Sequence, residues 1–121
     1  MGKTVLLADD DKEFRGTVAV ALERAGINVV QASDGMGALE HLSRSLPDLI
    51  ISDLNMPVMD GETFCRRVRA VSAYNAIPFV ILSAMVEMDG ASLANIPADL
   101  CLSKQSPLSE ILSQLQDLIA D

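Results

Sequence analysis

The sequence predicts an α/β fold in which five parallel strands form one sheet flanked by helices. Short runs rich in Val, Ile and Leu alternate with segments whose apolar residues recur at helical spacing, and this alternation is typical of that class. Three of the five runs are continuously apolar, as expected for strands that are buried on both faces. The predicted strands are residues 5–8, 27–30, 49–51, 79–82 and 100–102.

Helices are predicted between and after the strands, where one apolar stripe repeats at a period near 3.6 residues. The stripes lie within residues 14–25, 38–46, 64–71 and 108–119. For the last of these helices we expect Ser106 as the N-cap and Pro107 as the first helical residue. A short fourth helix is expected within residues 88–95, confined by Gly90 and Pro97, which makes five helices in all.

Composition narrows the function classes. The 121 residues suit one domain, and 50% of them are apolar, which is enough for a buried core. Nine Lys and Arg residues against seventeen Asp and Glu residues give a net charge of −8, which argues against direct binding to nucleic acid. No segment reads as a signal peptide or a membrane span, and Cys65 and Cys101 are isolated, so we expect reduced thiols in the cytoplasm.

Polar residues follow the predicted strands at their carboxyl ends. Asp9 and Asp10 follow the first strand, Asp53 the third, Ser83 the fourth and Lys104 the fifth. Right-handed crossovers bring these ends to one edge of the sheet, which is where open α/β sheets bind ligands. Each residue could have a local structural role, but four such coincidences on one edge favour a functional site.

Charge balance indicates what this site could do. Asp9, Asp10 and Asp53 supply three negative charges, which Mg²⁺ and Lys104 would neutralise. Oxygen ligands without Cys or His suit Mg²⁺, with Mn²⁺ as an alternative. Such a site could stabilise an acyl phosphate on a carboxylate, with the cation, the lysine and a hydroxyl each contacting a phosphoryl oxygen.

A second reading assigns the first acidic run to another chemistry. Asp9 could be the nucleophile of a small Mg²⁺-dependent phosphohydrolase, with Asp11 as its acid. Glu13 then stands where such an enzyme would be expected to have Thr, and the Asp53 segment is left without a role. For Asp11 we favour an N-cap position on the first helix.

Four segments carry a resemblance to the receiver domains of two-component signalling, and it covers essentially the whole chain, residues 1–121. The segment DLNMPVMDG that begins at Asp53 resembles the family's phosphoacceptor segment nearly letter for letter. The segments VLLADDD from Val5, ILSA from Ile81 and LSK from Leu102 resemble the strands that end in the acidic pair, the switch hydroxyl and the lysine.

The resemblance implies a flavodoxin-like, doubly wound sheet with strand order 2-1-3-4-5. It implies that Asp53 accepts the phosphoryl group, with Ser83 and Lys104 assisting. It also implies that Asp53, Asp10 and the backbone carbonyl of Asn55 bind Mg²⁺ directly, with Asp9 as a ligand through water.

The implied partners are a sensor histidine kinase or histidine phosphotransfer protein as donor and a downstream protein as target. The domain would catalyse only its own phosphorylation and dephosphorylation, so it would not be an enzyme acting on a separate substrate. The fourth helix, fifth strand and fifth helix would form the readout surface. Self-association into a homodimer through the last helix and strand is a further option in the family.

Three residues depart from the family pattern near the fifth strand. Cys101 stands where Tyr or Phe is usual, and Gln105 where a proline usually follows the lysine through a cis bond. Pro97 stands where Gly is usual, so the turn into the strand must differ. For Lys104–Gln105 we expect either a trans peptide with a reshaped loop or a strained cis bond. These departures motivate the alternative of a degenerate receiver that acts as an interaction module without phosphorylation.

Overall fold

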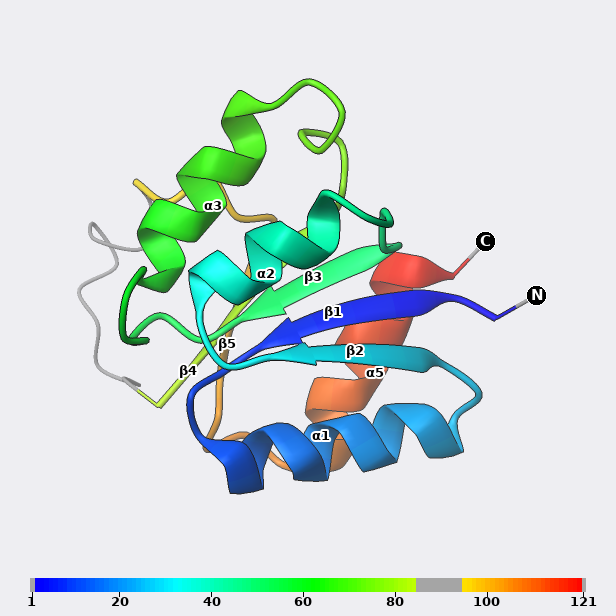
Figure 1. The fold of residues 1–121 in the computed structure, drawn as a ribbon. Coiled ribbons are helices and arrows are strands. Elements are labelled where there is room, and N and C mark those ends of the chain that lie inside the picture. The colour runs from blue at the N-terminus through cyan, green and yellow to red at the C-terminus, as the bar shows by residue number, and fades with distance from the viewer. Residues whose placement is uncertain (1, 85–94, 121) are drawn as a thin grey trace.

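The computed structural model describes residues 2–84 and 95–120 and confirms the α/β fold (Figure 1). The strands are β1 (Thr4–Ala8), β2 (Asn28–Ala32), β3 (Leu49–Ser52), β4 (Phe79–Ser83) and β5 (Leu100–Ser103). The helices are α1 (Lys12–Arg24), α2 (Gly35–Leu42), α3 (Gly61–Ala70) and α5 (Leu108–Ile119). Except for its last residue, the fourth helix expected within residues 88–95 lies outside the described residues.

All five strands pair in parallel in the order β2-β1-β3-β4-β5, as the sequence resemblance implied. Every residue of β3 and β4 is buried, which accounts for their unbroken apolar character. In Figure 1 both chain termini lie on the side where β1 begins, so the carboxyl ends of the strands form the opposite edge of the sheet.

Helices cover both faces of the sheet and build two apolar cores (Figure 1). One core lies between the sheet and the helices α2 and α3, and in it the ring centroids of Phe64 and Phe79 lie 5.3 Å apart. The other lies between the sheet and α1 with α5, and is centred on residues such as Leu22 and Leu115. Within the described part of the chain, no helix has the length and apolarity needed to cross a bilayer.

The start of α5 differs from the expectation by one residue. Pro107 is the N-cap, with φ −56° and ψ 140°, and the helix begins at Leu108. Ser106 belongs to the preceding turn, since its N–H donates to the carbonyl of Ser103 at 3.1 Å. The prediction of Ser106 as N-cap was therefore wrong, because a pattern of cap residues does not reveal how the turn before them closes.

Two arginines of α3 hold the segment that leads into β5. Arg69 donates to the carbonyls of Pro97, Asn75 and Ile77 and pairs with Asp99 at 2.8 Å. Arg66 donates to the carbonyl of Asn95 at 2.6 Å. Guanidinium groups present several donors in a fixed plane, so one side chain can satisfy several loop carbonyls at once.

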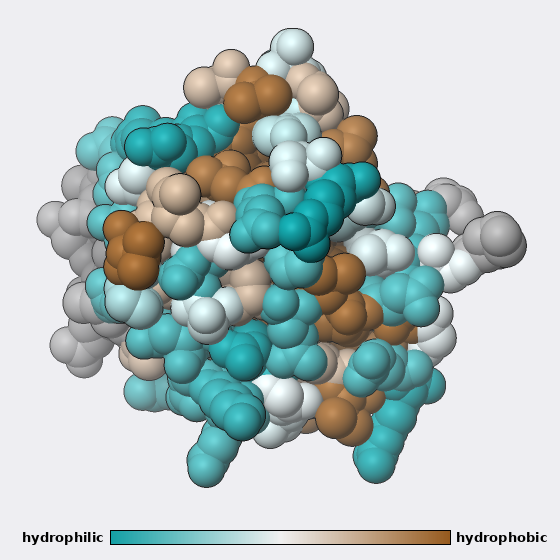
Figure 2. All heavy atoms as spheres, viewed as in Figure 1, coloured by the Kyte–Doolittle hydropathy of each residue, from teal (hydrophilic) through white to brown (hydrophobic). Residues whose placement is uncertain are grey.

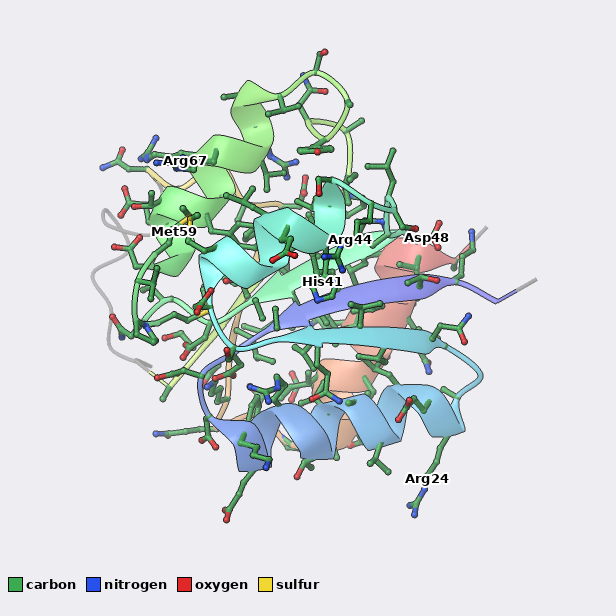
Figure 3. All side chains as sticks on the ribbon, in the orientation of Figure 1. Arg24, His41, Arg44, Asp48, Met59 and Arg67 are labelled. Atoms are coloured by element: carbon green, nitrogen blue, oxygen red, sulfur yellow. The ribbon has the colours of Figure 1, made fainter. Side chains whose placement is uncertain are left out.

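We expect the substitution Arg69→Ala to lower the free energy of unfolding by about 1 to 3 kcal/mol, because it removes the guanidinium donor from three loop carbonyls and the cationic partner from Asp99. Arg67→Ala is the matched control, since Arg67 is exposed on the same helix (Figure 3). Its effect should stay within about 0.5 kcal/mol. Urea unfolding of both variants measures the difference. Equal losses of unfolding free energy would show that Arg69 does not stabilise the segment before β5.

Candidate functional site

Three predicted site residues are fixed by backbone hydrogen bonds one step beyond their strands. The N–H of Asp9 donates to the last residue of β2 at 3.0 Å, and that of Asp53 to the last residue of β1 at 2.9 Å. The N–H of Lys104 donates to the last residue of β4 at 2.9 Å. Each strand therefore delivers its polar residue to the same edge, and the backbone holds it there.

The structure brings the predicted carboxylates together. Asp9, Asp10 and Asp53 each offer an oxygen, and these oxygens lie within 4.8 Å of one another. Asp9 and Asp53 are buried, at 1% and 8% exposed, whereas Asp10 is exposed to solvent. Ser83 is buried at the end of β4.

Lys104 compensates the two buried carboxylates. Its Nζ lies 2.7 Å from Oδ2 of Asp9 and 3.5 Å from Oδ2 of Asp53. Burial alone would lower the pKa of Lys104, but its hydrogen bond to Asp9 and the charges of Asp9 and Asp53 raise the pKa overall. The side chain is therefore a partly buried ammonium ion shared between two carboxylates.

The surroundings of Asp53 disfavour its charged form. Burial, followed by the negative charge of Asp9, raises the pKa of Asp53, while Lys104 and the N–H of Leu54 oppose the rise. That N–H donates to Oδ1 of Asp53 at 2.8 Å. Asp53 is thus a desolvated carboxylate held between one cation and one anion, which are conditions that favour binding of a further cation.

The donor set fits Mg²⁺. The ligands of one Mg²⁺ lie at most about 4 Å apart, so the 4.8 Å cluster needs only a small side-chain movement to hold the ion. All the donors are hard oxygens, and neither Cys65 nor Cys101 takes part. Asn55 is exposed two residues after Asp53, on the loop that would supply the implied carbonyl ligand.

Backbone contacts shape the loop after Asp53. A Cβ added to Gly61 would lie 2.1 Å from the carbonyl oxygen of Asp53, so any side chain there would displace the phosphoacceptor candidate. Val58 has φ 69°, and the N–H of Met59 donates to the carbonyl of Pro57 at 2.7 Å. This hydrogen bond closes a γ-turn whose positive φ is unfavourable for a β-branched residue.

The first turn of α1 contributes residues that the sequence analysis did not identify as part of the site. Asp11 is the N-cap, as expected, and its side chain accepts the N–H of Phe14. The Phe14 ring faces Nζ of Lys104 at 4.6 Å from its centroid, and Arg15 donates to the carbonyl of Asp9. From its helical spacing, Phe14 was predicted only as a core residue. Its contact with Lys104 joins residues far apart in the sequence, and a local pattern does not reveal it.

The residues that depart from the family pattern now have a structural description. The described residues contain no cis peptide bond, so the Lys104–Gln105 bond is trans, and the N–H of Gln105 donates to the Ser103 hydroxyl at 3.0 Å. A proline could not make that bond. Pro97 lies in a tight turn closed by the N–H of Ala98, and Cys101 is exposed on β5.

Known proteins that resemble this chain are response regulators or receiver domains. The family model described as response regulator receiver domain matches residues 5–116. Over 116 residues the chain is 34% identical to RpaA of Synechocystis, described as a DNA-binding dual master transcriptional regulator. The match covers 95% of this chain and 48% of RpaA, so the chain spans about half the length of that relative.

Solved structures give the same fold. A response regulator from Chloroflexus aurantiacus superposes with a TM-score of 0.91 at 29% identity and covers 100% of both chains. The receiver domain of the sensor histidine kinase PA1611 from Pseudomonas aeruginosa has a TM-score of 0.89 at 25% identity, again over 100% of both chains. That structure holds a magnesium ion coordinated in its active-site cleft.

Substituting Asp53→Asn should stabilise the protein when a chelator removes divalent cations. A carboxyl whose pKa is raised on folding destabilises the fold once it is ionised, so the penalty is complete above the folded pKa and vanishes below the unfolded one. We expect a gain on the order of 1 kcal/mol at neutral pH and none in strong acid. Thermal unfolding in EDTA at several pH values measures it, and a loss at neutral pH would contradict the prediction.

Substituting Val58→Gly should also stabilise the protein, by about 1 kcal/mol, because glycine adopts the positive φ without strain. Val58 is 80% exposed, so little burial is lost. Val20→Gly is the control, since Val20 is exposed within the helix α1, where glycine is unfavourable, and it should destabilise. Chemical denaturation compares the two variants. If both substitutions destabilise the protein, the backbone at Val58 is not strained.

Proposed function

The chain belongs to the response regulator receiver domain family, and on that premise we propose that it is a signalling switch that accepts a phosphoryl group on Asp53 in a Mg²⁺-dependent reaction. The observation that carries the proposal is the pairing of the buried Asp53 with a cation: Nζ of Lys104 lies 3.5 Å from Oδ2 of this carboxylate. A buried carboxylate with an ammonium ion beside it can be converted to an acyl phosphate while that cation offsets part of the added negative charge.

The proposed donor is a phosphohistidine on a sensor histidine kinase or a histidine phosphotransfer protein. An oxygen of Asp53 attacks phosphorus, the P–N bond breaks, and the imidazole nitrogen leaves with the electron pair and takes a proton. Hydrolysis later reverses the state: water attacks phosphorus, the P–O bond to Asp53 breaks, and inorganic phosphate and the carboxylate are released. Lys104 and the Ser83 hydroxyl would contact phosphoryl oxygens in both steps.

Asp53, Asp10 and the carbonyl of Asn55 would hold Mg²⁺, with Asp9 binding through water. The ion would supply positive charge against the transferring oxygens and hold them in place. Asp9 has a second task, since its Oδ1 accepts the N–H of Asp11 at 2.9 Å while its Oδ2 pairs with Lys104. Both oxygens of Asp9 are therefore engaged, which suits a positioning acid better than a nucleophile.

This geometry disfavours the phosphohydrolase alternative. Asp11 caps α1 through its side chain, at 3.1 Å from the N–H of Phe14, so it is not placed as a general acid for Asp9. We therefore propose catalysis limited to the protein's own phosphorylation and dephosphorylation. The cytoplasm is the proposed location, in keeping with two free cysteines.

Phosphorylation would alter a surface read by a downstream protein. The Ser83 hydroxyl would move toward the phosphoryl group, and the space it leaves would admit a neighbouring side chain. Cys101 is too small to report that movement as an aromatic ring would, so we propose that transmission runs chiefly through the backbone of the loops at this edge. The DNA binding in the name of RpaA is a property of that protein, and we propose no nucleic-acid contact for this domain.

Incubation with phosphoramidate or acetyl phosphate and Mg²⁺ should add the mass of one phosphoryl group to the intact protein. The gain should disappear in Asp53→Asn and in EDTA, and should persist in Asp117→Asn, because Asp117 is exposed on α5. Intact-protein mass spectrometry provides the measurement. A wild-type protein that gains no mass would favour the degenerate receiver, and a gain that survives Asp53→Asn would place the acceptor elsewhere.

A further inference from the structure

We propose that Phe14 is a positioning residue for phosphoryl transfer, because its ring holds the ammonium group of Lys104 against the acceptor site. The inference rests on the proposed function and deepens it by adding a residue of α1 to the site. Nζ of Lys104 lies 4.6 Å from the centroid of the Phe14 ring, within the range of a cation–π contact.

The surroundings of Lys104 leave little room for solvent. Its side chain is 11% exposed, and two carboxylates, those of Asp9 and Asp53, lie on its polar side. The Phe14 ring is a further neighbour. A cation–π contact gains strength where the cation has lost its water, so burial makes this contact matter more than it would on an open surface.

Phe14 is itself fixed from two directions. Its N–H donates to Oδ1 of Asp11, which anchors the first turn of α1. Its ring is partly buried against the core that α1 and α5 form with the sheet. The backbone of Phe14 is therefore anchored in the first turn of α1, and its ring is supported by the core as well as by Lys104.

An aromatic face offers attraction without competing for hydrogen bonds. The ring provides no oxygen or nitrogen acceptor, so the three N–H groups of Lys104 stay directed toward Asp9, Asp53 and the place where phosphoryl oxygens would arrive. The contact is also tolerant of direction, so the ammonium group can turn from Asp9 to a phosphoryl oxygen while it remains over the ring. Water at the same place would instead accept a hydrogen bond and draw the lysine outward.

The geometric half of the proposal has a direct spectroscopic test. Protons that lie over an aromatic face are shifted upfield, so in the folded protein the ε-CH₂ signal of Lys104 should lie upfield of those of Lys3 and Lys12. The Lys104 signal is identified by its absence in Lys104→Arg. In Phe14→Leu, which keeps an apolar side chain against the core, the shift should vanish, and in Phe14→Tyr it should return. A wild-type Lys104 signal that coincides with the other two lysines overturns the contact.

The functional half is tested by phosphorylation kinetics with acetyl phosphate. Phe14→Leu should lower the maximal rate roughly three- to tenfold, the factor expected from losing one cation–π contact, and Phe14→Tyr should restore it. The affinity for Mg²⁺, measured by calorimetry, and the KM for the donor should change less than about twofold, because the Phe14 side chain has no oxygen or nitrogen that could bind the ion or the donor. Thermal unfolding of each variant confirms that it is folded at the assay temperature.

The outcomes separate this inference from the function on which it rests. If wild-type Asp53 takes no phosphoryl group, the proposed function fails, and the positioning role fails with it. If the wild type is phosphorylated and Phe14→Leu reacts at the same rate, only the role of Phe14 is overturned. A rate that falls in both Phe14→Leu and Phe14→Tyr also overturns it, since the π face would then be irrelevant.

Discussion

The charge of Lys104, shared between Asp9 and Asp53, is the interaction on which the rest of the site depends. Two carboxylates that are almost fully buried would repel each other and favour protonation, and the ammonium group lies 2.7 Å from one and 3.5 Å from the other. The parallel sheet makes this placement possible. The polar residue that follows β1, β3 or β5 donates its backbone N–H to the last carbonyl of the neighbouring strand. Without that ladder the three charges could not share one small volume.

The site also depends on the helix that follows β1. Within one turn of α1, Asp11 caps the helix, Phe14 meets the ammonium group of Lys104, and Arg15 binds the carbonyl of Asp9. Arg15 also donates to the side chain of Gln31 in β2, so the same turn links two strand ends. The strands therefore set the position of the charged groups, and α1 limits how far those groups can move.

The fold and the charged centre could be predicted from the sequence because both follow from local patterns. Continuous apolar runs identify buried parallel strands, and topology brings the residues after them to one edge, so Asp9, Asp53 and Lys104 were found together. Phe14 could not be found in this way, because an aromatic residue on an apolar stripe looks the same whether or not a cation lies over it. Ser106 was misplaced for a similar reason, since its N–H closes a turn that residue preferences do not describe.

The hydrogen bonds from α3 to the chain before β5 affect which sequence changes that segment can accept. Arg66 and Arg69 bind the carbonyls of Asn95 and Pro97, so at these two points they recognise main chain rather than side chains. Those contacts place no demand on which amino acids occupy the two positions. The two contacts can then persist whichever side chains occupy positions 95 and 97, and sequence drift at these positions becomes compatible with a fixed scaffold.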